Sequence, residues 1–120
     1  MKKIIYILIL TLSLTNTSFA ASTSSGSSNS DYAKAYNLIK SAKKYEKKGK
    51  TEKAQKKYVK AQKLLLKSNK DKPLQADTLN YLGFTTRKLG DYKKGEKFYL
   101  EGLKIDPNHK GINEYLGELY

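Results

Sequence analysis

Cysteine and tryptophan are absent from the 120-residue sequence, which contains only one histidine and two prolines. Without cysteine, the chain cannot form a disulfide framework, a thiolate site for zinc or an iron–sulfur cluster, or a cysteine nucleophile. After the N-terminal segment, no apolar run approaches the roughly 20 residues that a helix needs to cross a bilayer. The remaining chain is long enough for one small domain with a single core.

The N-terminal segment has the pattern of an export signal. Residues 1–20 begin with Lys2 and Lys3, continue with an unbroken apolar run over residues 4–10, and end on Ser18-Phe19-Ala20. Small residues at positions 18 and 20 are typical of signal peptidase cleavage, here after Ala20. We therefore expect an exported protein of the bacterial periplasm. The alternative is that the segment is retained and anchors the protein to a membrane.

The next segment, residues 21–31, contains six serines and one glycine. Such a composition cannot bury enough apolar surface to offset the entropy of ordering the chain. The sequence therefore predicts a Ser-rich flexible leader over residues 21–31 and a folded domain over residues 32–120.

The folded part has the signals of helices and none of strands, because its apolar residues recur at helical spacing. The predicted helices span about residues 32–48, 52–67, 74–88 and 92–105, and a fifth begins near residue 108 or 109. The predicted helix caps are Ser30 or Asp31, Thr51 and Asp91. Gly49 and Gly90 are expected to end the first and third helices.

The pattern of the first two helices repeats in the next two at one constant offset along the chain. The matching pairs are Leu38 and Leu79, Ala42 and Gly83, Tyr45 and Thr86, Gly49 and Gly90, Ala54 and Gly95, Tyr58 and Tyr99, and Ala61 and Gly102. A second, shorter offset relates Leu82-Gly83 to Leu116-Gly117. Two antiparallel helices pack closely where one offers small residues and the other large ones, so this pattern predicts stacked helical hairpins.

Residues 76–109 resemble a tetratricopeptide repeat. The residues that carry this resemblance, and that we expect to pack the repeat, are Leu79, Leu82, Gly83, Tyr92, Gly95, Tyr99 and Pro107. The family usually has alanine where this chain has Gly95 and Gly102. The resemblance implies an all-α fold, a right-handed α-α superhelix of about two and a half repeats over residues 35–68, 76–109 and 110–120.

The same resemblance implies a non-enzymatic scaffold that binds a peptide or helix of another protein in a concave groove. The register of the family places these residues on or near the groove: Lys43, Lys47, Asn80, Phe84, Arg87 and Glu114, with Glu118 beside them. The family's clamp for C-terminal carboxylates is not implied, because Ile39 and Tyr81 occupy positions where Lys and Asn are expected.

No catalytic, metal or cofactor site can be assembled from the sequence. Gly49-Lys50-Thr51 has the ending of a phosphate-binding loop, but position 44 is Lys44 where that motif needs glycine. His109 is the only imidazole and has no neighbouring nucleophile or metal-ligand set. Glu114 and Glu118 lie one turn apart and are better explained as a solvated helix face. We therefore expect no enzyme and no cofactor.

Charge is distributed unevenly along the chain. Residues 32–72 contain fifteen lysines and three acidic residues, whereas residues 73–120 contain seven of each sign. The first half would attract any polyanion, so the alternative function is electrostatic binding of lipid headgroups, envelope polymers or acidic proteins. Arg87 is the only arginine, which argues against specific nucleic-acid recognition and is also compatible with a lysine-rich solvated face.

The C-terminal residues form an apolar stripe with no following helix to cover it. Leu116, Leu119 and Tyr120 make up this stripe. Repeat arrays usually end in a polar capping helix. We therefore expect either that the sequence is an incomplete copy of a longer protein or that the stripe contacts a partner or a second copy of the chain.

Overall fold

Five α-helices follow one another in the part of the chain that the computed structural model describes, backbone residues 22–119 and side chains 31–118. They are α1 (Ser22–Lys47), α2 (Thr51–Asp71), α3 (Ala76–Lys88), α4 (Tyr92–Ile105) and α5 (Lys110–Leu119). The described residues contain no strand, so the predicted all-α class is confirmed for them. The predicted signal peptide and its cleavage site lie outside the described residues.

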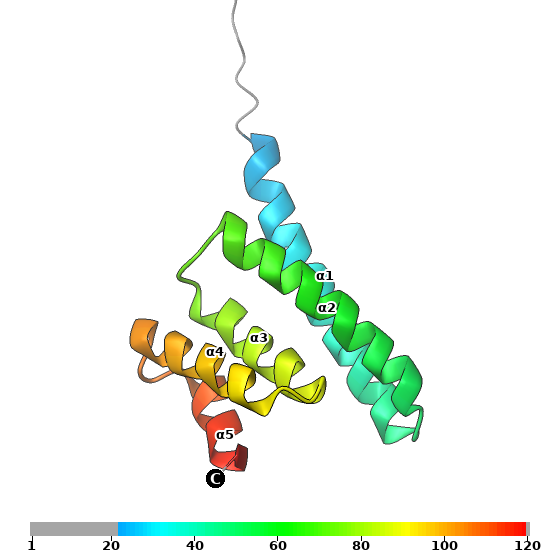
Figure 1. The fold of residues 1–120 in the computed structure, drawn as a ribbon. Coiled ribbons are helices and arrows are strands. Elements are labelled where there is room, and N and C mark those ends of the chain that lie inside the picture. Colours follow the sequence, from blue (N-terminus) through cyan, green and yellow to red (C-terminus); the bar gives the residue numbers. More distant parts are fainter. Residues whose placement is uncertain (1–21, 120) are drawn as a thin grey trace, which may run out of the picture.

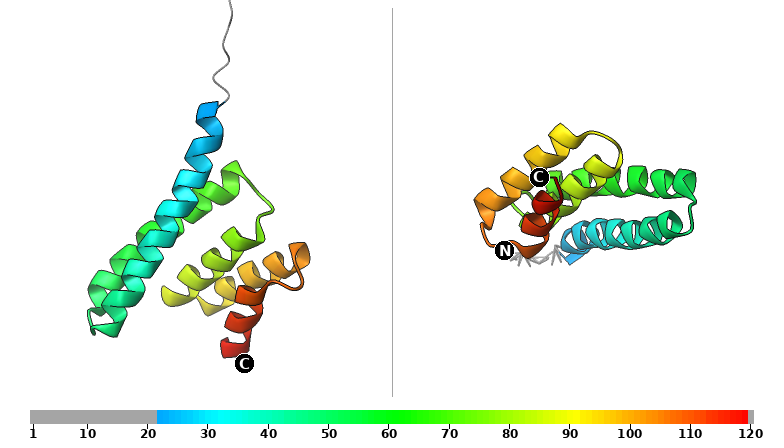
Figure 2. Two further views of the ribbon diagram at one scale, coloured as in Figure 1. Left: turned by 180° about the vertical axis from the view of Figure 1, so that it is seen from behind. Right: turned by 90° about the horizontal axis from the view of Figure 1, so that it is seen from below.

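Each helix packs against the next one along the chain, and α3 also contacts both α1 and α5. Figure 1 shows α1 and α2 as a long antiparallel hairpin, with the shorter hairpin of α3 and α4 beside it. The two further views in Figure 2 show α5 against the second hairpin, at the opposite end of the molecule from the α1–α2 turn. Helix α3 is therefore central, because it contacts all four other helices.

Both hairpins turn through the same backbone motif. Gly49 and Gly90 have positive φ angles, of 72° and 96°. After α1, the Gly49 N–H donates to the Glu46 carbonyl and the Lys50 N–H to the Tyr45 carbonyl. After α3, the amides of Gly90 and Asp91 make the equivalent bonds at the matching positions of the repeat. This is the pattern of a Schellman motif, in which glycine adopts the left-handed conformation at no steric cost.

The N-terminal start of the fold differs from the prediction. Helix α1 begins at Ser22, whereas the sequence predicts a flexible leader up to residue 31 and a cap at Ser30 or Asp31. Helix nucleation is costly but propagation from an existing helix is not, and serine is only moderately unfavourable in a helix. The helix therefore continues from the packed part of α1 back into the serine-rich segment. Its first turns project beyond the end of α2 (Figure 1).

The other boundaries shift by a few residues. Helix α2 continues to Asp71, past the predicted end near residue 67, and α3 begins at Ala76 rather than near residue 74. Asp91 caps α4 as predicted, since its side chain accepts a hydrogen bond from the Lys94 N–H. Thr51 is the first residue of α2, and no side-chain hydrogen bond caps that helix.

Equivalent positions of the two hairpins supply the core. Tyr58 in α2 and Tyr99 in α4 are both fully buried. The buried apolar residues among those described are Ala35, Ile39, Ala42, Ala54, Tyr58, Ala61, Leu65, Leu79, Leu82, Phe84, Tyr99, Ile112 and Leu116. The members of this set come from all five helices, so one continuous core joins both hairpins and α5.

The second hairpin packs around its glycines. A Cβ atom on Gly83 would overlap the Tyr99 ring, and one on Gly95 would lie 3.0 Å from the Gly83 carbonyl oxygen. A Cβ on Gly102 would overlap the Ile112 side chain. The glycines therefore allow α4 to approach α3 and α5 more closely than alanine would.

Two packing predictions need correction. Tyr92 is 61% exposed, at the first position of α4. Leu116 is buried within the common core, whereas the sequence predicts that it belongs to an uncovered apolar stripe. The side chains of Leu119 and Tyr120 lie outside the described residues. Pro107 lies exposed in the turn between α4 and α5.

Candidate functional site

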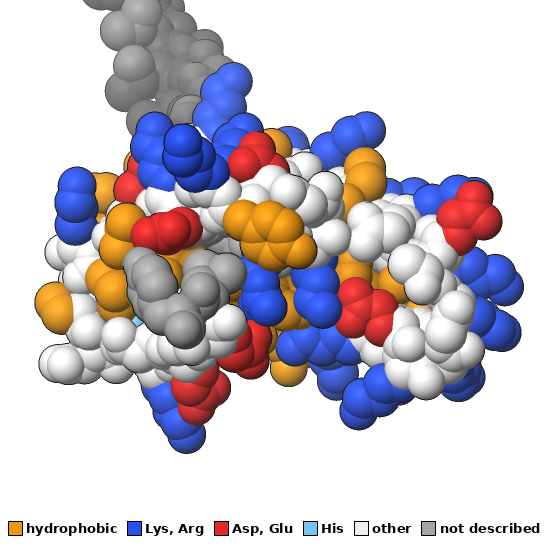
Figure 3. All heavy atoms as spheres, turned by 60° about the horizontal axis from the view of Figure 1, so that its bottom comes forward, with side chains coloured by type: hydrophobic (Ala, Val, Ile, Leu, Met, Phe, Trp, Pro, Cys, Tyr) orange, Lys and Arg blue, Asp and Glu red, His pale blue; other side chains and the backbone are white. Residues whose placement is uncertain are grey.

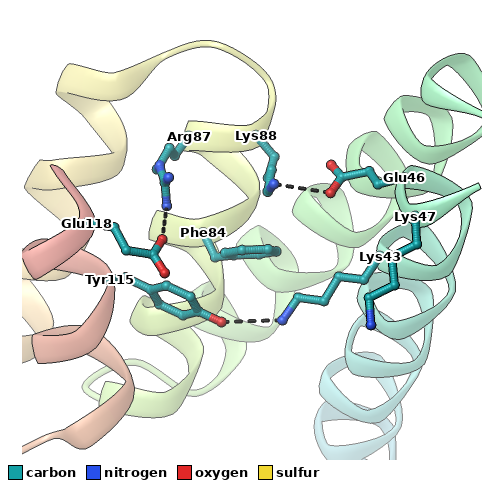
Figure 4. Close-up of a pocket in the computed structure, with 8 residues that line it drawn as sticks. All are labelled: Lys43, Glu46, Lys47, Phe84, Arg87, Lys88, Tyr115 and Glu118. Carbon is teal, nitrogen blue, oxygen red and sulfur yellow. Dashed lines mark hydrogen bonds and ion pairs between the residues drawn. The ribbon is translucent and has the colours of Figure 1, made fainter. Parts of the chain in front are cut away.

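A pocket of about 280 Å³ opens between α1, α3 and α5. Eight side chains line it: Lys43, Glu46 and Lys47 from α1, Phe84, Arg87 and Lys88 from α3, and Tyr115 and Glu118 from α5. Figure 4 shows α3 between the other two helices, with side chains from all three directed toward the same space. The first helix of each hairpin and α5 thus contribute to one concave site.

Aromatic rings form the inner surface of the pocket. Phe84 is only 3% exposed and its ring centroid lies 5.0 Å from that of Tyr115. Behind them, Tyr58 packs edge-on against Phe84, and Tyr99 stacks on Tyr115. Such aromatic pairs are rigid and hold their geometry through packing, so the pocket has a preformed apolar base.

Lysine ammonium groups lie over this aromatic base. The Lys43 Nζ atom is 4.6 Å from the centroid of the Phe84 ring and donates a 3.4 Å hydrogen bond to the Tyr115 hydroxyl. The Lys88 Nζ atom is 5.6 Å from the same Phe84 centroid. The negative face of an aromatic ring attracts a cation at these distances, so Phe84 helps to hold both lysines at the pocket.

Two ion pairs connect the walls of the pocket. The pair of Arg87 Nη1 and Glu118 Oε2, 3.0 Å apart, joins α3 to α5. The pair of Lys88 Nζ and Glu46 Oε2, 3.1 Å apart, joins α3 to α1. The remaining cations, Lys43 and Lys47, have no carboxylate partner among the described residues. The pocket therefore carries two more cations than carboxylates, and this excess favours a negatively charged occupant.

Two tyrosine hydroxyl groups behind the pocket, those of Tyr58 and Tyr99, are buried without a hydrogen-bond partner among the described residues. A charged group lies near each of them, Glu46 near Tyr58 and Arg87 near Tyr99. Burial is the main cause that raises the pKa of both hydroxyls, and the negative charge of Glu46 adds to it at Tyr58. Both tyrosines therefore remain neutral at physiological pH and contribute packing rather than charge.

The structure brings most of the predicted groove residues together, but not all. Lys43, Lys47, Phe84, Arg87 and Glu118 line the pocket. Asn80 and Glu114 do not.

The two misplaced residues have clear physical reasons. Asn80 is 6% exposed and fills the contact between α3 and α5, where a Cβ on Gly111 would lie 2.9 Å from its amide nitrogen. Glu114 is exposed on α5, and its Oε1 atom lies 4.0 Å from the Nζ atom of Lys110, one turn earlier on the same helix. Asn80 is therefore a packing residue, and Glu114 belongs to a solvated helix face.

Sequence reasoning missed Glu46, Lys88 and Tyr115. Residues three or four apart share a helix face. Lys88 lies one turn after Phe84 and Tyr115 one turn before Glu118, so helical spacing from predicted groove residues could have identified both. Glu46 lies three residues after Lys43, so the same spacing could have identified it, and its carboxylate pairs with Lys88.

The single histidine has a structural environment. His109 Nδ1 accepts a hydrogen bond from the Ile112 N–H at the start of α5, and Nε2 lies 2.6 Å from Asp77 Oδ1. Because Nδ1 accepts a hydrogen bond, the proton of the neutral ring lies on Nε2. The Nε2–H group then donates to Asp77. His109 therefore caps α5 and joins it to the first turn of α3.

Known proteins provide no family assignment: the chain matches no model of a protein family and no curated protein. Within the described residues, no cluster of three or more potential metal-binding side chains occurs. None of the helices in that part of the chain combines the length and the apolar character that a membrane span needs.

Proposed function

We propose that the chain is a tetratricopeptide-type repeat protein, a right-handed superhelix of about two and a half helical hairpins. Three observations support this proposal. The two hairpins close through the same turn at matching positions of the sequence repeat. Equivalent small residues, alanine in one hairpin and glycine in the other, lie buried at their interfaces. Helix α3 contacts α1 and α5, as the first helices of successive repeats do.

The proposed function is non-enzymatic binding of another protein, as an interaction module or scaffold of the bacterial cell envelope. The observation that carries it is the pocket between α1, α3 and α5, which has a rigid aromatic base and an excess of cations. Helices and extended peptides bind in grooves of this kind through side chains that fill preformed pockets. The charge of the pocket favours a segment that carries aspartate or glutamate beside an apolar residue.

Selection of peptides from a random display library on the full chain without residues 1–20 tests this function. We expect enrichment of acidic peptides that bind the wild-type protein. The double variant Lys43→Glu/Lys47→Glu reverses both unpaired cations of the pocket and should lose these peptides, with at least a tenfold rise in Kd.

A matched control is available one residue further along the chain, at the end of α1 and in the turn after it. Lys44→Glu/Lys48→Glu has the same spacing and the same change in charge, but neither residue lines the pocket. This control should retain the selected peptides. Equal loss of binding in both double variants, or failure to enrich any peptide, would contradict binding in the pocket.

The proposed location in the periplasm rests on residues 1–20 and has a separate test. After expression of the full chain in a bacterium, the N-terminus of the protein recovered from the periplasm should be Ala21. Recovery of intact Met1 in the membrane fraction would support the alternative of an anchored protein. Recovery of intact Met1 in the cytoplasm would contradict both.

A further inference from the structure

A row of exposed lysines runs along the outer face of α2. Lys53, Lys56, Lys60, Lys63, Lys67 and Lys70 recur at alternating intervals of three and four residues. This spacing keeps them on one side of a helix. The face opposite to them carries the buried residues Ala54, Tyr58, Ala61, Leu65 and Ser68. We name the six lysines the α2 lysine row; it spans about 25 Å at 1.5 Å per residue.

The central part of the α2 lysine row is electrostatically unbalanced. Within the part of the chain that the structure describes, only Lys67 has carboxylate partners, and its Nζ atom lies 2.7 Å from Asp31 and 3.1 Å from Asp71. Lys56, Lys60 and Lys63 have none among the described residues. Figure 3 shows the wider setting, in which Lys and Arg side chains gather around the end of the molecule where α1 joins α2. The unpaired ammonium groups repel one another, and an external anionic surface would relieve this repulsion.

Two apolar side chains interrupt the lysines on the same free face. Val59 is 39% exposed and Leu66 is 42% exposed. Val59 lies one turn from Lys56 and Lys63, and Leu66 lies one turn from Lys63 and Lys70. The outer face of α2 is thus a mixed row of cations and apolar groups.

We infer that the outer face of α2 docks on the surface of an anionic lipid bilayer. The ammonium groups of the α2 lysine row would lie among the negatively charged headgroups, with Val59 and Leu66 against the boundary of the acyl chains. A soluble polyanion offers no apolar layer for these two side chains, so the mixed composition favours a bilayer. Lysine also suits diffuse attraction to a charged surface, which needs no guanidinium fork.

This surface is separate from the pocket. The pocket lies between α1, α3 and α5 and contains no residue of α2. A molecule attached to a bilayer through α2 would therefore leave the pocket free for its proposed peptide. Loss of one binding activity need not affect the other.

Sedimentation with lipid vesicles tests this inference on the full chain without residues 1–20. The probe is a vesicle of equal parts phosphatidylcholine and phosphatidylglycerol, compared with one of phosphatidylcholine alone. We expect binding only to the anionic vesicle, and weaker binding at high salt. Because each lysine near such a surface contributes about 1 kcal/mol, Lys56→Glu/Lys60→Glu/Lys63→Glu should lower the partition coefficient by roughly 100-fold or more.

A control variant separates this face from net charge alone. Lys40→Glu/Lys44→Glu/Lys48→Glu makes the same change in charge on exposed positions of α1 and the turn that follows it, and should lower binding far less. Val59→Thr/Leu66→Gln should weaken binding to the vesicles several-fold and leave binding to immobilised heparin unchanged. Equal losses in the two lysine variants would overturn the inference. So would a Val59/Leu66 variant that binds vesicles like the wild type, since the partner would then be any polyanion.

Discussion

The two hairpins share one register and turn geometry, but they differ in their small residues and in their charge. The interface of α1 and α2 has Ala42, Ala54 and Ala61 where the α3–α4 hairpin has glycine. Residues 32–72 carry fifteen lysines against three acids, and residues 73–120 are balanced. The two hairpins therefore share the positions of their small and large core residues, whereas their surface charge differs.

This comparison also separates two roles within the molecule. The glycines of the second hairpin allow the Tyr99 ring to lie directly on the backbone of α3. The first hairpin presents its cations outward, along α2 and at the pocket. The second hairpin is thus the more closely packed, and the first carries most of the electrostatic potential.

The largest expected effect comes from the equivalent core tyrosines. Tyr58→Ala and Tyr99→Ala should each lower the free energy of unfolding by about 3–5 kcal/mol, because each removes a fully buried ring and leaves a cavity. Similar losses of unfolding free energy for the two variants, measured by urea denaturation, would support the equivalence of the hairpins. A much smaller loss for Tyr58→Ala would contradict it.

Phenylalanine at either position provides the matched control. Because neither hydroxyl has a hydrogen-bond partner among the described residues, Tyr58→Phe and Tyr99→Phe should leave stability unchanged or raise it. A loss of more than about 1 kcal/mol on removal of a hydroxyl would mean that the group makes a hydrogen bond after all.

An intermediate effect is expected at the glycines. Alanine is the better helix former by about 1 kcal/mol, but at Gly83 its Cβ would overlap the buried Tyr99 ring. Overpacking typically costs about 1–3 kcal/mol, so Gly83→Ala should lower the free energy of unfolding by about 1 kcal/mol.

Gly117 is the control, because it follows Leu116 as Gly83 follows Leu82, and a Cβ there would meet no atom within 4 Å. Gly117→Ala should raise the midpoint of thermal unfolding, with a gain of up to about 1 kcal/mol. If both substitutions stabilise the protein, the close approach in the second hairpin is not what requires glycine.

The smallest effect is expected at alkaline pH. Burial, reinforced by the charge of Asp77, raises the pKa of Tyr32 from 10.0 to about 12. Below pH 10 the hydroxyl is protonated in the folded and the unfolded chain, so Tyr32 causes no pH dependence. Between pH 10 and 12 the unfolded chain releases the proton first, so stability falls as the pH rises. Urea denaturation across this range should show a shallower decline for Tyr32→Phe than for the wild type; identical slopes would contradict the raised pKa.

The elements that sequence reasoning predicted well depend on local chemistry. Helical spacing, the left-handed glycines Gly49 and Gly90 and the cap at Asp91 act within a few residues. Five helices and the turns within both hairpins therefore follow from the sequence. The start of α1 does not, because composition alone omits the ease of extending a helix that tertiary packing already holds.

The candidate site was only partly predictable because three helices form it. The register placed Lys43, Lys47, Phe84 and Arg87 on the surfaces of α1 and α3 that line the pocket. The orientation of α5 depends on contacts distant in sequence, such as Asn80 against Gly111. No local pattern encodes those contacts, so Asn80 and Glu114 were misplaced.

The joint between the two hairpins has one further consequence. Leu74, between α2 and α3, has a φ angle of 63°. This left-handed backbone conformation is unfavourable for any residue with a bulky side chain. Gln55 and Gln62 of α2 reinforce the joint through hydrogen bonds to Lys88 and Thr86 of α3. One wall of the pocket lies on the first hairpin and the others on α3 and α5. The width of the pocket therefore depends on how the two hairpins are joined, at a place that contains none of its lining residues.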